Sequence, residues 1–292
     1  MQLETLKVFC DIVETRSFAT AASKNFVTPS AVSQVVRMLE QRYGCQLLER
    51  TRGNLQLTPA GEVLYQASKE IVDRYQDMEA RLQALTGVVA GTVRVGTVHS
   101  IGLYELAGPL KRFLKAYPQV NLALEYSRAN QIYDDASNGN VDLGVVAYPQ
   151  KRPGIVVVAI RQDRLVLACP PGHPLTANRR VAVKKLGSEP MVGFERDIPT
   201  RREADRILRS YHVEANYVME LDNIETIKRA VEIGRGVAIL PEPALAREVE
   251  DGTLVAVHLD DQTFLRPVGI IHRQGKHFSP AAEKFIEYLK AE

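Results

Sequence analysis

The sequence has few cysteines, and none of them forms a pattern that binds metals or builds disulfides. Its 292 residues include Cys10, Cys45 and Cys169, which are far apart and contain no CxxC pair. Disulfide frameworks and structural zinc sites need numerous or closely spaced cysteines. We therefore expect reduced, buried thiols in a protein of a reducing compartment.

The sequence also lacks the apolar segments that direct a chain to or across a membrane. No apolar run approaches the length that spans a bilayer. The opening MQLETLKVFCDIVE has no basic leader with an apolar stretch and a small-residue cleavage site. We expect a cytoplasmic protein with no membrane partner. A hydrophobic content of 45% indicates a globular chain, and 292 residues favour more than one domain.

Signatures of common enzymes are absent as well. The sequence contains no GxGxxG, GxxxxGK[ST], HExxH or GxSxG motif. Its six histidines show no metal-ligand spacing; His272 and His277 are five residues apart, with no cysteine or carboxylate expected beside them. We therefore expect no catalytic residues, no metal site and no cofactor.

Charge is nearly balanced over the whole chain but not in its N-terminal part. The formal net charge is +2, yet six basic residues face only two acidic ones between Arg16 and Arg52. Acids outnumber bases over residues 53–87. A local basic cluster is what contacts with nucleic-acid phosphates require.

Residues 17–61 predict two short helices followed by a basic hairpin. Thr28 suits an N-cap, Pro29 suits the first helical position, and Gly44 can end a helix that runs to about Arg42. This is the layout of a winged helix-turn-helix, whose second helix enters the major groove. An ordinary amphipathic surface helix is the alternative. The apolar side of the helix is expected at Ala31, Val35, Met38 and Leu39, flanked by Val32 and Val36, and the polar side at Ser30, Ser33, Gln34 and Arg37.

Six short motifs occur in order along this segment: Ser17–Phe18, Ala21–Ala22, Ala31–Val32–Ser33, Leu39–Glu40, Gly44 and Leu57–Thr58–Pro59–Ala60–Gly61. With these motifs the segment resembles the N-terminal domain of LysR-type transcriptional regulators. The resemblance implies double-stranded DNA as a partner, with Gln and Arg reading base edges and basic hairpin residues on phosphates. The candidate DNA-contacting residues are Thr28, Pro29, Ser30, Ser33, Gln34, Arg37, Arg50 and Arg52.

Two positions depart from the family pattern. Asn25 stands where a Leu is common, so the apolar anchor is expected one residue later, at Phe26. Pro29 stands where the family often has a Gln that touches DNA, which leaves Gln34 and Arg37 with more of the base contacts.

A long helix is predicted from Pro59 to about Thr86. It resembles the family's linker helix, which implies a homodimer or homotetramer that sets two recognition helices on successive major grooves. A helix packed along its own domain is the alternative. The 4-3 spacing of a coiled-coil seam is carried by Leu64, Ser68, Ile71, Tyr75, Met78, Leu82 and Leu85. Residues 87–91 form a Gly-rich hinge.

From Thr92 onward, strands alternate with helices, which predicts a parallel α/β sheet. The predicted strands are 92–98, 120–126, 141–147, 164–169, 191–194, 217–221 and 236–240, and the predicted helices are 103–117, 132–138, 200–211 and 224–232. Segments 139–143, 173–175 and 232–241 resemble the family's effector domain, which is similar to periplasmic binding proteins.

The resulting fold class is α+β and multi-domain. It comprises a winged helix-turn-helix at 1–58, a linker helix at 59–87 and an effector-binding domain at 88–292. The resemblance implies two α/β subdomains joined by two crossing strands, with subdomain I at 92–161 plus 267–292 and subdomain II at 162–266.

The effector is expected in the cleft between these subdomains. Ligands of open α/β sheets bind at the carboxyl ends of strands and on helix N-termini. Ala147 stands where relatives that bind a small oxyanion carry a hydroxyl, which favours a partly apolar acid. Thr200 as an N-cap, Arg201 in salt bridges and His99 as a structural hydrogen bonder stay open as alternatives. The candidate effector-binding residues are Thr97, His99, Ser100, Arg128, Ala147, Phe194, Glu195, Thr200 and Arg201.

Together these features predict a ligand-responsive transcriptional regulator. Its expected partners are promoter DNA, a small carboxylate or other oxyanion, further copies of itself and RNA polymerase. Some LysR-type proteins sense oxidants through a cysteine pair in the C-terminal domain, but this domain has only Cys169, so redox sensing is rejected. A solute-binding protein is the alternative function, opposed by the DNA-binding segment and by the absence of a signal peptide.

Overall fold

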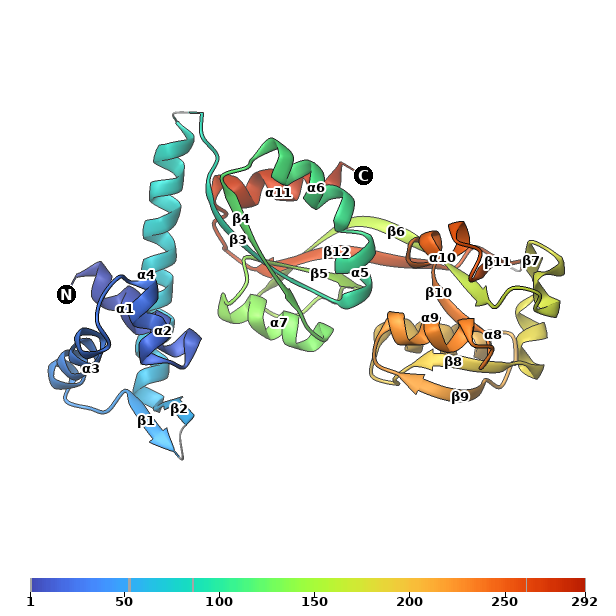
Figure 1. Cartoon of the computed structure of the whole chain (residues 1–292), viewed down its shortest axis with the longest axis horizontal. Coiled ribbons are helices and arrows are strands. Elements are labelled where there is room, and N and C mark those ends of the chain that lie inside the picture. The colour runs from blue at the N-terminus through green and yellow to red at the C-terminus, as the bar shows by residue number, and fades with distance from the viewer. Residues whose placement is uncertain (1, 52–53, 86, 261, 292) are drawn as a thin grey trace. The chain divides into compact units, whose positions relative to one another are not determined.

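The structure, a computed structural model, describes residues 2–51, 54–85, 87–260 and 262–291. The chain divides into two compact units, Met1–Val88 and Val89–Glu292, which are drawn in Figure 1. The first unit is a winged helix-turn-helix with a long final helix. Its elements are α1 (Leu3–Thr15), α2 (Phe18–Lys24), α3 (Pro29–Tyr43), β1 (Leu48–Thr51), β2 (Asn54–Leu57) and α4 (Pro59–Ala84).

Helix α3 begins and ends where its capping residues predict. The Thr28 hydroxyl accepts a hydrogen bond from the Ala31 N–H at 3.3 Å, Pro29 is the first helical residue, and Gly44 ends the helix in the left-handed conformation. These signals are local, so the sequence alone is sufficient to place the helix.

The buried side of α3 differs from the expected one. Val32, Val36 and Leu39 are buried, whereas Met38 is 47% exposed. Val32 and Val36 pack with residues of α1 and α2, including Ala21. Because side chains three and four apart share a helix face, a stripe set by these residues excludes Met38. The assignment of Met38 to the packed side was wrong.

The expected apolar anchor at Phe26 is also wrong. Phe26 is 97% exposed and adopts a left-handed backbone with φ of 55°. Asn25 points inward instead, and its Nδ2 donates to Asp11 Oδ2 at 2.7 Å and to the Ala21 carbonyl at 2.9 Å. A polar pair thus occupies the place of an apolar contact.

Cys45 is exposed, contrary to the expectation of buried thiols, while Cys10 and Cys169 are buried.

Helix α4 packs on its own unit at its beginning and is apolar and exposed further along. Tyr65, Ser68 and Val72 are buried, and Tyr65 packs with Phe9 and Leu39. The later positions of the 4-3 series are exposed by between 42% and 84%: Ile71, Tyr75, Met78, Leu82 and Leu85. The rest of the first unit therefore covers the apolar series only at the beginning of α4, and the later residues of the series are exposed.

The second unit contains a mixed sheet, not the parallel sheet that was expected. Its strands follow the order β4-β3-β5-β12-β6-β11-β7, with β10 also paired to β6, and β8 and β9 form a separate pair. Strand β3 is parallel to β4 and β5, but β12 is antiparallel to both β5 and β6. The strands are β3 (Gly91–Thr97), β4 (Val120–Tyr126), β5 (Leu143–Ala147), β6 (Ile155–Cys169), β7 (Arg180–Val181), β8 (Pro190–Phe194), β9 (Asn216–Leu221), β10 (Ala238–Pro241), β11 (Val255–Leu259) and β12 (Leu265–Arg273).

Two long strands connect the halves of this unit. One half has a core of residues from 93–147 and 268–289, and the other has cores within 165–264. Strands β6 and β12 run through both halves (Figure 1). The expected strand at 164–169 was too short because β6 begins at Ile155. The helices are α5 (His99–Tyr104), α6 (Ala107–Ala116), α7 (Ala129–Asn138), α8 (Pro199–Ser210), α9 (Ile224–Glu232), α10 (Ala246–Glu250) and α11 (Pro280–Lys290).

The helix expected at 103–117 is two helices, α5 and α6, separated at Glu105 and Leu106. Glu105, at this break, is buried, and its carboxylate accepts a hydrogen bond from Arg266. Among the described residues, no helix is long and apolar enough to cross a membrane.

Candidate functional site

Three of the four residues on the polar side of α3 are exposed. Ser30, Gln34 and Arg37 are exposed, opposite the buried stripe of Val32, Val36 and Leu39. Gln34 and Arg37 are three residues apart and therefore share a face. Both side chains are long enough to reach base edges in a major groove.

The remaining DNA-contact candidates differ in how the structure places them. Thr28 and Pro29 are exposed at the start of α3, and the Thr28 hydroxyl lies 2.8 Å from that of Ser30. Ser33 is half-buried, and its hydroxyl donates to the Pro29 carbonyl at 3.0 Å. Arg50 belongs to β1, but its side chain, and the whole of Arg52, lie outside the described residues.

The second unit contains a cavity of about 440 Å³. The cavity lies between the carboxyl ends of β3, β4 and β5 on one side and the first turns of α8 and α9 on the other. Six of the predicted effector residues line it: His99, Ser100, Arg128, Ala147, Phe194 and Thr200. The lining also includes residues that were not predicted, among them Tyr126, Tyr133, Tyr148, Gln150, Arg152, Asp222 and Asn223.

Three predicted effector residues are not part of this lining. Thr97 is fully buried, and its hydroxyl donates to the Val145 carbonyl at 3.1 Å. Arg201 is 3% exposed, donates to the Phe194 carbonyl at 2.5 Å, and lies over the ring of Tyr217. Glu195 lies at the rim in an ion pair with Arg128. Thr97 and Arg201 therefore support the walls of the cavity through these buried contacts and do not line it.

Arg128 joins the two sides of the cavity. Its guanidinium contacts Glu195 and Asp197, each at 2.6 Å. Arg128 precedes α7 in one half of the unit, and both acids precede α8 in the other half. Two carboxylates thus already compensate the positive charge that was expected to attract an anion.

Thr200 lies in the first turn of α8, but it is not the N-cap. Ile198 occupies that position, and its side chain caps nothing. Thr200 is 4% exposed. Pro199 has no N–H, and the Arg201 N–H donates to the Ile198 carbonyl at 3.0 Å, so Thr200 is the residue of this turn whose N–H can face the cavity.

A buried charge network lies behind Ser100. Arg266 has no exposed surface, and its Nη1 donates to the Ser100 hydroxyl at 3.0 Å. The same guanidinium binds Glu105 and contacts Asp163 at 2.7 Å. Arg161 completes the network at 3.3 Å from Asp163. Burial raises the pKa of Glu105 to about 7, while the Arg266 charge opposes that shift.

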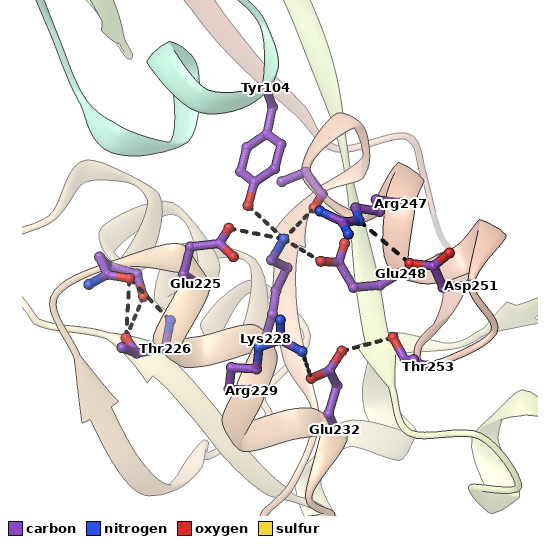
Figure 2. A network of polar contacts seen from close by, with 12 residues as sticks. Tyr104, Glu225, Thr226, Lys228, Arg229, Glu232, Arg247, Glu248, Asp251 and Thr253 are labelled. Carbon is purple, nitrogen blue, oxygen red and sulfur yellow. Dashed lines mark hydrogen bonds and ion pairs between the residues drawn. The ribbon is translucent and has the colours of Figure 1, made fainter. Parts of the chain in front are cut away.

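A second network fixes the other end of α5 (Figure 2). Lys228 is 2% exposed, and its ammonium donates to the Tyr104 hydroxyl at 2.6 Å and to Glu248 at 2.7 Å. Glu225 lies at 3.0 Å from the same nitrogen. Tyr104 comes from α5, whereas Lys228 and its acids belong to the other half of the unit. Helix α5 therefore contacts the cavity at Ser100 and the opposite half at Tyr104.

Sequence reasoning missed both networks, although one carried a signal. In α9 the apolar positions Ile224, Ile227 and Val231 follow helical spacing, and Lys228 falls on the same stripe. A charged residue at a core position predicts a buried partner. No comparable local signal identifies the partners, since Tyr104 lies 124 residues away in the sequence.

Comparison with known proteins shows that both parts of the chain match domain models of the same protein family. Residues 3–62 match the model of bacterial regulatory helix-turn-helix proteins of the lysR family, and residues 86–292 match the LysR substrate binding domain. The HTH-type transcriptional activator CmpR of Synechocystis is 28% identical over 99% of this chain and 95% of its own length. The RuBisCO operon transcriptional regulator of Allochromatium vinosum is 27% identical over 100% and 96%.

Solved structures share the fold over the whole length. A full-length OxyR variant from Pseudomonas aeruginosa superposes with a TM-score of 0.79 at 22% identity, covering 100% of this chain and 94% of that one. Full-length CbnR in complex with its target DNA gives 0.69 at 20% identity, with coverage of 100% and 99%.

Proposed function

The chain belongs to the LysR family of transcriptional regulators, and on that premise we propose that a small organic acid in the cavity controls its binding to promoter DNA. The observation that carries the proposal is the separation of two surfaces. An exposed polar helix face, with Gln34 and Arg37, lies in one unit, and a lined cavity lies in the other.

The proposed division of labour follows the chain. Residues 1–58 bind DNA, residues 59–87 pair two copies of the chain, and residues 88–292 bind the effector. The exposed apolar series of α4 supports self-association into a dimer or tetramer. We further propose that the assembly works in the cytoplasm and acts on RNA polymerase at the promoter.

Replacing Arg37 by Ala should reduce affinity for the cognate operator by roughly 10–100-fold, because a good base contact contributes about 1–3 kcal/mol. Binding to random DNA should change much less. Arg42→Ala, an exposed residue of the last turn of α3, is the matched control and should weaken both DNAs alike. Fluorescence anisotropy on both DNAs measures this. An equal loss on both for Arg37→Ala would exclude it as a base-reading residue.

The cavity fits an organic acid better than an inorganic ion. Its volume of about 440 Å³ lies in the range of pockets that enclose small organic ligands. Ala147 and Phe194 contribute apolar surface, and Thr200, in the first turn of α8, contributes its N–H and its hydroxyl. An acid that entered would compete with Glu195 and Asp197 for Arg128. That competition would separate the two halves at this point and supply a route from binding to conformational change.

Ser100→Ala and Thr200→Ala should each lower affinity for the acid roughly tenfold, because each removes one hydrogen-bonding hydroxyl from the cavity. Operator affinity without the acid should stay within about twofold, since the substitutions lie in the other unit. Ser188→Ala, outside the cavity lining, is the matched control. Titration calorimetry against a panel of small acids provides the test. The anion assignment fails if both variants bind as the wild type does, or if only uncharged compounds bind.

A further inference from the structure

Ser100 is the point where the cavity meets a buried arginine. Its side chain is half-buried and lines the cavity, whereas Arg266 is completely buried and cannot contact a ligand itself. The hydrogen bond between them, Arg266 Nη1 to Ser100 Oγ, measures 3.0 Å. Because the Ser100 oxygen accepts from Arg266, its own proton is directed elsewhere. A ligand oxygen in the cavity is a natural acceptor for it.

The charges around Arg266 determine how much positive potential reaches Ser100. Glu105 and Asp163 bind the guanidinium directly, and Arg161 faces both acids, at 3.7 Å from Glu105 and 3.3 Å from Asp163. Two arginines therefore balance two carboxyl groups when all are ionised. Loss of one negative charge would leave the network with a net positive charge behind Ser100. In a buried setting that charge acts over several ångströms.

We propose that Arg266 is a positioning residue for the effector, which holds Ser100 as a hydrogen-bond donor and adds positive potential, so that the site selects an anionic oxygen of the acid. This inference rests on the proposed function of the cavity and names the group that Ser100 recognises. It also assigns Glu105 a role, because its charge subtracts from that of Arg266.

Glu105→Gln provides the sharpest test. Glutamine keeps the shape and still accepts a hydrogen bond from Arg266, but it carries no charge. At pH 8 this variant should bind the acid about 3–10-fold more tightly than the wild type, as expected for one charge added at this separation. At pH 6 the difference should nearly vanish, because burial raises the pKa of Glu105 to about 7 and the wild-type carboxyl is then mostly neutral.

The measurement is calorimetric titration of the full chain with acetate, succinate, benzoate and glycerol 3-phosphate. In the Ser100→Ala background, Glu105→Gln should increase affinity by a clearly smaller factor, since the donor is gone and only the positive potential of Arg266 remains. Glu214→Gln, an exposed acid outside the cavity lining, is the charge-matched control and should leave affinity unchanged. A purely structural role for the network would predict weaker binding in Glu105→Gln at both pH values.

The possible outcomes distinguish a failure of the Arg266 role from a failure of the proposed anion site. Equal affinity of wild type and Glu105→Gln at pH 8, or a gain that is undiminished without Ser100, overturns the role of Arg266 and leaves the proposed function standing. Failure of all four acids to bind the wild type contradicts the anion site itself, and this inference falls with it.

Discussion

Replacing Ile71 and Met78 together by aspartate should halve the mass of the particle in sedimentation and reduce affinity for a two-half-site operator at least 100-fold. Both side chains are nearly half exposed on α4, at 48% and 46%, in the later part of the 4-3 series, which its own unit leaves exposed. Such a series packs against a second helix with the same spacing. Two unpaired carboxylates in that contact would be buried without compensation, which is strongly unfavourable.

Gln76→Asp provides the control for this experiment, because Gln76 is exposed on α4 but lies outside the 4-3 series. It should retain the wild-type mass and operator affinity. A double aspartate variant that kept the wild-type mass would show that these residues do not lie between copies of the chain. Single half-sites should still bind the variant weakly, since each recognition helix stays intact.

Replacing Lys228 by methionine should lower the free energy of unfolding of the second unit by about 3–5 kcal/mol, the usual cost of leaving a buried charge without its partner. Lys228 is 2% exposed, and its loss leaves Glu248 uncompensated while Tyr104 loses its donor. Urea unfolding followed by circular dichroism measures the change. The chain has no tryptophan, so fluorescence would depend on tyrosine alone.

A second substitution in this variant tests whether the unpaired Glu248 carboxylate causes the loss of stability. Adding Glu248→Gln to Lys228→Met removes the orphaned charge and should recover part of the stability. Arg229→Met, at the neighbouring exposed position, should leave the unfolding midpoint nearly unchanged. A Lys228→Met variant as stable as the wild type would show that the network does not hold the two halves together.

Elements with local signals were predictable from the sequence. Thr28, Pro29 and Gly44 cap α3, and the helix predicted at 224–232 is α9. Strand β6 was predicted only at 164–169, and β12 was not among the predicted strands, because their pairing depends on residues about 100 positions apart. Met38 was placed on the wrong side of α3, since only packing on α1 and α2 decides which apolar residues are buried.

The cavity was predictable only in part, for a related reason. Strand order brings the carboxyl ends of β3 and β5 together, so Ser100 and Ala147 could be named from the sequence. Their neighbours across the cavity, and the charges behind them, come from distant segments. Arg266 lies 161 residues from Glu105 in the sequence, and no local pattern connects them.

The central claim is that an acid bound in one unit changes operator binding by the other. The direct measurement is an anisotropy titration of the full chain on an operator selected from genomic DNA, with and without the tightest-binding acid of the panel. We expect at least a thousandfold preference over random DNA, and a change in operator affinity or half-site preference of at least fivefold with the acid. A chain with no sequence preference, or one whose operator binding the acid leaves unchanged, would contradict it.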